Sequence, residues 1–179
     1  MPRLITLLVC SLFALKALVL IDATGLWSDE LYSVGKSFQP SLMGLVEMLR
    51  NDTHPPLYYL VLWGWGQALD QTPLTLRLLS WLAYLAGAAL VVRQSAAMAS
   101  HGSTRTAVSV AALLMLCSPY PIRFSVEGKS YALLVALVAL CWWCRRRWLD
   151  GTGADWAYGL SVVLASLTHF YGAFLFAAA

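Results

Sequence analysis

Long apolar stretches alternate with short polar segments along this chain of 179 residues. Apolar stretches of this kind are typical of helices that cross a bilayer, because about 20 apolar residues span the hydrocarbon core. A weaker stretch, 56–69, follows Pro55 and has only about 14 residues, so we expect a short helix there that does not cross. The strong apolar runs cover residues 4–21, 74–92, 106–122, 131–144 and 156–176.

The polar region between the first two strong runs also has a helical pattern. Apolar residues recur there at helical spacing, while Glu47 and Arg50 fall on the opposite face. The pattern predicts a short amphipathic helix on the membrane surface, with an apolar face made of Leu42, Leu45, Val46 and Leu49.

Composition agrees with the membrane interpretation. The chain is 60% hydrophobic and 12% charged, with a mean hydropathy of +0.68, whereas a soluble domain carries about 25% charged residues. We therefore predict an all-α fold: a polytopic transmembrane helical bundle that forms one module over residues 1–179, with short amphipathic helices in its first extracytoplasmic loop. A net charge of +3 without a basic stripe argues against nucleic-acid binding.

The two ends of the chain carry further expectations. The run 4–21 resembles a signal peptide, but Lys16 interrupts it and residues 21–25 make a poor cleavage site, which favours an uncleaved signal anchor. The chain stops inside an apolar run, at residues 177–179, so we expect an N-terminal fragment of a longer protein.

Arginines set the expected topology. The triplet Arg145–Arg147 is the strongest signal for the cytoplasmic side, and Arg3, Arg93 and Arg105 agree with it. The scheme requires 56–69 to stay on the outer side. The residues expected outside are then Asp22, Asp29, Glu30, Glu47, Asp52, His54, Asp70, Arg77, Arg123, Glu127 and Lys129, with His169 near the outer end of the last run.

The cysteines carry little functional signal. Cys141 and Cys144 form a C-x-x-C pair, but no second pair or histidine cluster accompanies them. We interpret all four cysteines as small apolar residues of membrane helices.

The first polar cluster, residues 26–32, contains adjacent acids just outside a membrane helix. Asp29 or Glu30 can act as a general base or a metal ligand there. The alternative is structural: Ser28 or Asp29 caps a short helix, and Glu30 lies in its first turn. The two interpretations are compatible.

The second polar cluster, residues 51–59, places a histidine before two prolines. His54 and Asp52 are held at the membrane surface by this rigid segment and are candidates for substrate or metal binding. An ordinary interfacial turn is the alternative, and we assign Tyr58 and Tyr59 to that role as aromatic anchors.

The third polar cluster, residues 124–131, contains Glu127 and Lys129 at the start of a helix. The two side chains form either a simple interfacial ion pair or a phosphate site in which Glu127 orients Lys129. Arg77, at another outer helix end, can join that site. His169 is an ionisable residue in an apolar segment, so it is either functional or hydrogen-bonded between helices.

The order of these clusters resembles the membrane glycosyltransferases of the glycosyltransferase-C superfamily. The similarity is greatest to the bacterial family 39, the protein mannosyltransferase-like group, and it runs through nearly the whole chain. The matching segments are Trp27–Glu30, Asp52–Tyr59, Arg77, Glu127–Tyr131 and His169–Gly172.

The resemblance implies transfer of a sugar from a polyprenyl-phosphate carrier to a lipid, glycan or protein acceptor on the outer side of a bacterial inner membrane. It implies catalytic roles for Asp29, the expected base, and for its neighbour Glu30. It also implies substrate or phosphate contacts by Asp52, His54, Arg77, Glu127, Lys129 and His169, and in some members a divalent metal, for which Glu30, Asp52 and His54 are the candidates.

Two features depart from that family. Lys129 stands where arginine is more usual, so the site has a point charge in place of a bidentate fork. The chain is also shorter than such enzymes, which puts its independent activity in doubt. The alternative is a non-catalytic membrane protein, either a transporter fragment or a truncated transferase remnant.

Overall fold

The computed structural model describes residues 2–21, 23–100 and 102–177, and its described residues form helices and loops without any strand. The all-α prediction is therefore confirmed. The elements are α1 (Pro2–Leu20), α2 (Ser28–Ser37), α3 (Leu42–Leu49), α4 (Leu57–Ala68), α5 (Pro73–Met98), α6 (Thr104–Cys117), α7 (Pro119–Ser125), α8 (Tyr131–Leu149), α9 (Asp155–Thr168), the 3-10 turn η1 (Phe170–Ala173) and α10 (Phe174–Ala177). Asp22 lies outside the described residues.

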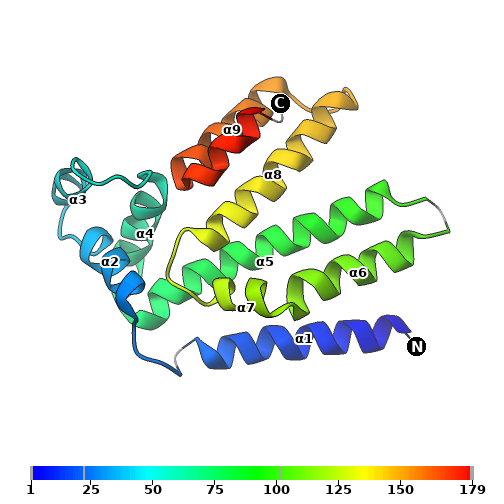
Figure 1. Ribbon diagram of the computed structural model, residues 1–179, viewed down its shortest axis with the longest axis horizontal. Helices are drawn as coiled ribbons and strands as arrows, with labels where there is room; N and C mark the ends of the chain where they lie inside the picture. Colours follow the sequence, from blue (N-terminus) through cyan, green and yellow to red (C-terminus); the bar gives the residue numbers. More distant parts are fainter. Residues whose placement is uncertain (1, 22, 101, 178–179) are drawn as a thin grey trace.

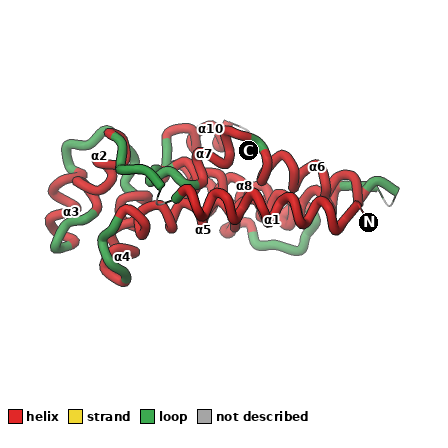
Figure 2. Tube along the Cα trace, turned by 90° about the horizontal axis from the view of Figure 1, so that it is seen from below, coloured by secondary structure: helices red, strands yellow, loops and turns green. Residues whose placement is uncertain are grey.

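The long helices lie side by side, and the short ones gather at one end. Figure 1 shows the order α1, α6, α5, α8, α9 across the molecule, and neighbouring helices in that order are in contact. Helices α2, α3 and α4 pack against one another at the end where α5 begins, which gives the molecule its elongated outline in Figure 2. The polar region between the first two strong apolar runs is therefore confined to one end of the bundle.

The run 74–92 continues to Met98, and three other predicted apolar runs also have different ends in the structure. The run 106–122 breaks at Ser118, which is extended (φ −76°, ψ 138°) because the following Pro119 disfavours a helical residue before it. The run 131–144 continues through the arginine triplet to Leu149, since arginine is a good helix former. The run 156–176 stops at Thr168, because His169 is extended (φ −158°, ψ 147°).

Helix α5 is the one described helix that is both long and apolar enough to cross a membrane by length and composition. Two shorter apolar helices, α6 and the segment Cys10–Leu20 of α1, accompany it. The weak run 56–69 is the 12-residue helix α4, as short as predicted, and at 1.5 Å per residue it extends about 18 Å, well below the roughly 30 Å of a hydrocarbon core.

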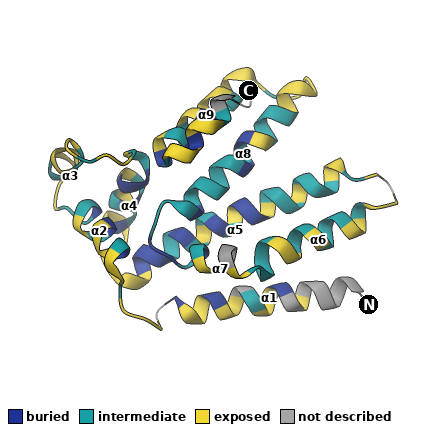
Figure 3. Ribbon diagram, in the orientation of Figure 1, coloured by how far each residue is buried: buried dark blue, intermediate teal, exposed yellow. Residues whose placement is uncertain are grey.

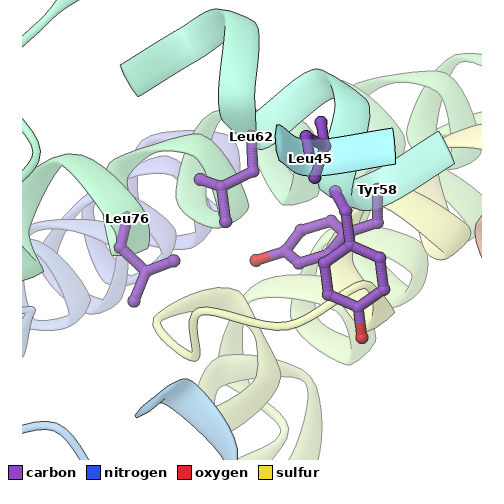
Figure 4. Packing of buried hydrophobic residues seen from close by; sticks show 5 residues of the cluster. Leu45, Tyr58, Leu62 and Leu76 are labelled. Atoms are coloured by element: carbon purple, nitrogen blue, oxygen red, sulfur yellow. The ribbon is translucent and has the colours of Figure 1, made fainter. Parts of the chain in front are cut away.

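The main core lies where the short helices meet α5. Leu45, Tyr58, Leu62 and Leu76 come from α3, α4 and α5 and pack together with Tyr59 (Figure 4). Figure 3 shows the buried residues concentrated in this region and along α5. Of the predicted apolar face of α3, Leu45 is fully buried, whereas Leu42 and Val46 are exposed.

A second contact fixes α5 against α8. A Cβ atom on Gly87 would lie 2.9 Å from the Cα of Ala136, so only glycine allows this close approach of the two backbones. Tyr84 and Ala88 on α5 pack there against Ala132 on α8. The contact holds the start of α8, with the polar turn before it, beside the start of α5.

Candidate functional site

A buried ion pair joins the first polar cluster to helix α5. Arg77 donates from Nε to Oε1 of Glu30 at 2.8 Å and from Nη2 to Oε2 at 2.7 Å. The two residues are 3% and 1% exposed, respectively. This bidentate geometry is the one that a planar guanidinium and a carboxylate favour.

The same pair organises the loops around it. The guanidinium of Arg77 also donates to the carbonyls of Ile21 at 2.7 Å, Thr24 at 2.8 Å and Gly25 at 3.0 Å. Glu30 accepts hydrogen bonds from the backbone N–H groups of Trp27 and Gly128, and Gly128 lies against Leu76 with no room for a Cβ atom. The end of α1, the start of α2 and the turn before α8 are therefore tied to one buried centre.

These contacts change the roles expected for Glu30 and Arg77. Burial alone would raise the pKa of Glu30, but the hydrogen bonds from Arg77 and Gly128 outweigh it and lower the pKa. Glu30 is thus an ionised, paired carboxylate in the first turn of α2. The geometry favours a positioning role for both residues over direct catalysis by Glu30 and direct phosphate binding by Arg77.

The neighbouring acid, Asp29, faces a different environment. It is half-buried and lines a cavity of about 290 Å³ formed by α2, the turn before α4, the start of α8 and the end of α9. The cavity brings together the three polar clusters of the sequence and His169. Its lining residues are Asp29, Tyr32, Lys36, His54, Tyr58, Lys129, Ser130, Tyr131 and His169.

Lys129 is the cation of this cavity that the sequence analysis identified. Burial lowers its pKa, and the negative charge of Asp29 opposes that shift. Its backbone N–H donates to the carbonyl of Glu127 at 2.7 Å in a tight turn, and its own carbonyl accepts from Ser80 on α5. The turn therefore fixes the backbone of Lys129 just before α8 begins.

Lys36 is a second cation of the cavity, and it lies beside Asp52. Lys36 Nζ is 2.5 Å from Asp52 Oδ2, and His54 Nδ1 is 2.9 Å from Asp52 Oδ1. The backbone N–H of His54 also donates to that Oδ1 atom at 3.2 Å. Asp52 thus orients Lys36 and His54 from one side, and it does not itself line the cavity.

The pKa of Asp52 reflects these partners. Burial raises it, but the hydrogen bonds from Lys36 and His54 prevail and lower it to about 2. A carboxyl with a lowered pKa stabilises the fold above its unfolded value of about 3.9, and the contribution is lost as the pH falls towards 2. We expect Asp52→Asn to flatten the acid-induced loss of stability between about pH 4 and pH 2, measured as melting temperature against pH. An unchanged acid limb in this variant would contradict the ion pair.

Aromatic rings close the other side of the cavity. The rings of Tyr131 and His169 are 5.5 Å apart between centroids, and those of His169 and Tyr171 are 4.7 Å apart. His169 accepts at Nδ1 from the backbone N–H of Tyr171, which sets the orientation of its ring. His169 therefore lines the cavity together with residues of the three polar clusters.

Glu127 faces away from Lys129. It is 6% exposed, its Oε2 atom has no hydrogen-bond partner, and it lines a second cavity of about 290 Å³ with Trp27 and Arg123. Burial raises its pKa. Because Lys129 lines the other cavity, the ion pair considered for these two side chains is not formed, and Glu127 does not orient Lys129.

Two of the residues considered for a metal already have other partners. Glu30 is saturated by Arg77 and backbone donors, while Asp52 already pairs with Lys36 and His54. In the described parts of the chain, no group of three or more His, Cys, Asp or Glu side chains could hold a metal ion. The positive charges in the cavity with Asp29 are the side chains of Lys36 and Lys129.

The cavity also contains Lys36, Tyr32 and Tyr58, which were not predicted as site residues from the sequence. Asp29, Tyr32 and Lys36 are spaced by three and four residues, which places them on one face of α2. That periodicity is a local signal that identifies Lys36 as a neighbour of Asp29. No local signal identifies Tyr58, which is fully buried although it lines the cavity.

Comparison with known proteins found no matching protein family, no matching curated protein and no matching solved structure.

Proposed function

We propose that this chain is a polytopic membrane protein that transfers a sugar from a polyprenyl-phosphate donor to an acceptor on the extracytoplasmic side of the membrane. The observation that carries the proposal is the cavity at one end of the apolar helices. It combines Asp29 with the cations Lys36 and Lys129. A carboxylate beside two cations suits a reaction in which a hydroxyl loses a proton and a phosphate leaves.

Exposed apolar stripes support the membrane placement. On α9, exposed large apolar side chains recur every three or four residues, and α1 has a similar stripe. Such long apolar faces are typical of surfaces that meet a partner or a membrane. The stripes consist of Trp156, Leu160, Val163 and Leu167 on α9 and of Leu8, Leu12, Leu15 and Val19 on α1. With lipid against these faces, we propose that α1, α5, α6 with α7, and α8 cross the membrane, whereas α9, whose 14 residues extend about 21 Å, enters it without crossing by itself.

The charge distribution supports the orientation. Tyr131 begins α8 at the cavity, whereas Arg145–Arg147 lie at the other end of the same helix. On α5, Arg77 lies near the first residue and Arg93 near the last. By the positive-inside rule, the end of the bundle that carries Arg93 and Arg145–Arg147 is cytoplasmic, and the cavity at the other end is extracytoplasmic.

Cysteine labelling tests this orientation. Thr53, which is exposed beside His54, reports on the outer side, and exposed Ser100 reports on the inner side. In cells, an impermeant maleimide should modify Thr53→Cys and leave Ser100→Cys unmodified until the membrane is opened. Equal labelling of both from outside would overturn the topology.

The proposed reaction is a single displacement with inversion. The acceptor oxygen attacks the anomeric carbon of the sugar and its proton passes to Asp29. The bond from that carbon to the phosphate oxygen breaks, and polyprenyl phosphate leaves with the electron pair. Lys36, Lys129 and His54 stabilise the negative charge on the phosphate, while Asp52 positions two of them and His169 lines the sugar side.

Donor binding provides a test that does not depend on the acceptor. We expect Lys129→Gln to weaken binding of a prenyl-phosphate hexose about tenfold, because a charge-assisted hydrogen bond contributes about 1.5 kcal/mol or more. Lys129→Arg should retain most of the affinity. The measurement is isothermal titration in detergent, with Arg50→Gln as a control because Arg50 is exposed and outside the cavity. Equal affinity of wild type and Lys129→Gln would remove Lys129 from the phosphate site.

A further inference from the structure

A separate cavity lies at the opposite end of α5 and α8. It has a volume of about 240 Å³ and is lined by Arg93, Gln94, Ala97, Trp143, Arg146, Arg147 and Asp150. We propose that this cavity binds the phosphate of an anionic phospholipid headgroup in the inner leaflet. The inference rests on the membrane placement proposed above and is independent of sugar transfer.

The charges of this cavity are not balanced within the protein. Three arginines line it, but Asp150 is the single acid among the lining residues, which leaves two positive charges in excess. Asp150 is already engaged by Arg146, at 3.5 Å between Nε and Oδ2. An anion in the cavity would relieve the repulsion among the remaining guanidinium groups.

Two of these arginines share one aromatic ring. The guanidinium carbons of Arg93 and Arg147 lie 5.8 Å and 5.1 Å from the centroid of Trp143. Cation–π contacts hold both charged groups in place. One donor of Arg147, Nη2, is taken by the carbonyl of Thr152, and the other N–H groups of the pair can donate to oxygen atoms of a ligand. Two cations held over one ring form a preorganised pair of donors for a phosphate.

Backbone contacts keep the walls of the cavity together. Gln94 on α5 donates to the carbonyl of Ala139 on α8 at 2.9 Å, and Arg147 donates to the carbonyl of Thr152 at 2.9 Å. The positive-inside rule explains only why arginines lie on the cytoplasmic side of the membrane. It does not require that three of them surround one cavity between two connected helices.

Apolar residues near the cavity favour a lipid over free phosphate. Met98 ends α5, and Trp148 and Leu149 end α8 beside Arg147; all three are exposed. Such side chains are suited to acyl chains next to a headgroup. Basic pockets between membrane helices on the cytoplasmic side are a known form of lipid headgroup site.

Native mass spectrometry of the purified full chain tests the proposal. Phosphatidylglycerol and phosphatidylcholine are titrated in detergent micelles, and the retained lipids are counted. We expect preferential retention of phosphatidylglycerol by the wild type. Arg93→Gln should weaken this binding about fivefold, whereas Arg105→Gln should change it less than twofold, because Arg105 is exposed on α6 and outside the cavity. If Arg93→Gln does not fold, Arg146→Gln takes its place with the same expectation.

Three outcomes would overturn the proposal. The first is equal retention of the two lipids, and the second is equal weakening by Arg93→Gln and Arg105→Gln. The third is displacement of the lipid by millimolar inorganic phosphate at constant ionic strength, which would make the cavity a site for free phosphate. Labelling of Thr53→Cys and Ser100→Cys reports on the membrane placement separately, so its failure is distinguishable from a failure of lipid binding.

Discussion

Replacing Asp29 with asparagine should lower sugar transfer about 10²- to 10⁴-fold, the range that a positioned general base contributes. Asparagine has nearly the volume of aspartate but cannot take the proton of the acceptor. Binding of the donor should change little, because the proposed phosphate contacts are made by Lys36 and Lys129 and not by Asp29. Transfer is measured as release of polyprenyl phosphate from a radiolabelled prenyl-phosphate hexose.

Asp70→Asn provides the matched control for this prediction. Asp70 is an exposed acid in the connection between α4 and α5 and is absent from the cavity lining. Transfer by Asp70→Asn should equal that of the wild type. Equal transfer by Asp29→Asn and the wild type would instead exclude Asp29 as the base.

The largest effect on stability is expected from Arg77→Met. The substitution removes the guanidinium group and leaves Glu30 charged and buried without its main partner. Breaking a buried ion pair in this way lowers the free energy of unfolding by about 3–5 kcal/mol. The carbonyls of Ile21 and Thr24 would lose their donor as well. We expect a much lower melting temperature in detergent, measured by intrinsic fluorescence or circular dichroism.

Double substitution separates the ion pair from the rest of the network. Glu30→Leu combined with Arg77→Met should be less destabilising than the sum of the single changes, because neither variant residue leaves a charge buried. Glu47→Gln, at an exposed acid on α3, should leave the melting temperature unchanged. Strictly additive losses for Glu30 and Arg77 would show that the pair is not coupled.

The helices and the convergence of the polar clusters were predictable from the sequence. Apolar runs and helical spacing report directly on burial and on exposure to lipid, and the charge pattern placed Asp29, His54, Lys129 and His169 on one side. The structure brings these four residues to one cavity. The expected topology itself stays a prediction until it is labelled.

The partners of individual side chains were not predictable in the same way. Glu30 and Arg77 are 47 residues apart, and nothing local to either residue indicates the other. Adjacent residues such as Asp29 and Glu30 point in different directions on a helix, so one became a cavity residue and the other a buried anchor. Glu127 was likewise assigned by its closeness to Lys129 in sequence, although the tight turn between them sends the side chains to different cavities.

Transfer by the wild-type chain is the most direct test of the central claim. The purified chain in lipid vesicles is incubated with radiolabelled polyprenyl-phosphate hexoses and a bacterial membrane extract as the source of acceptor. The proposal predicts that label leaves the donor, that polyprenyl phosphate accumulates in equal amount, and that both stop in Asp29→Asn. Label that stays on every donor tested, together with no donor-dependent rise in melting temperature, would contradict the assignment of this cavity to sugar transfer.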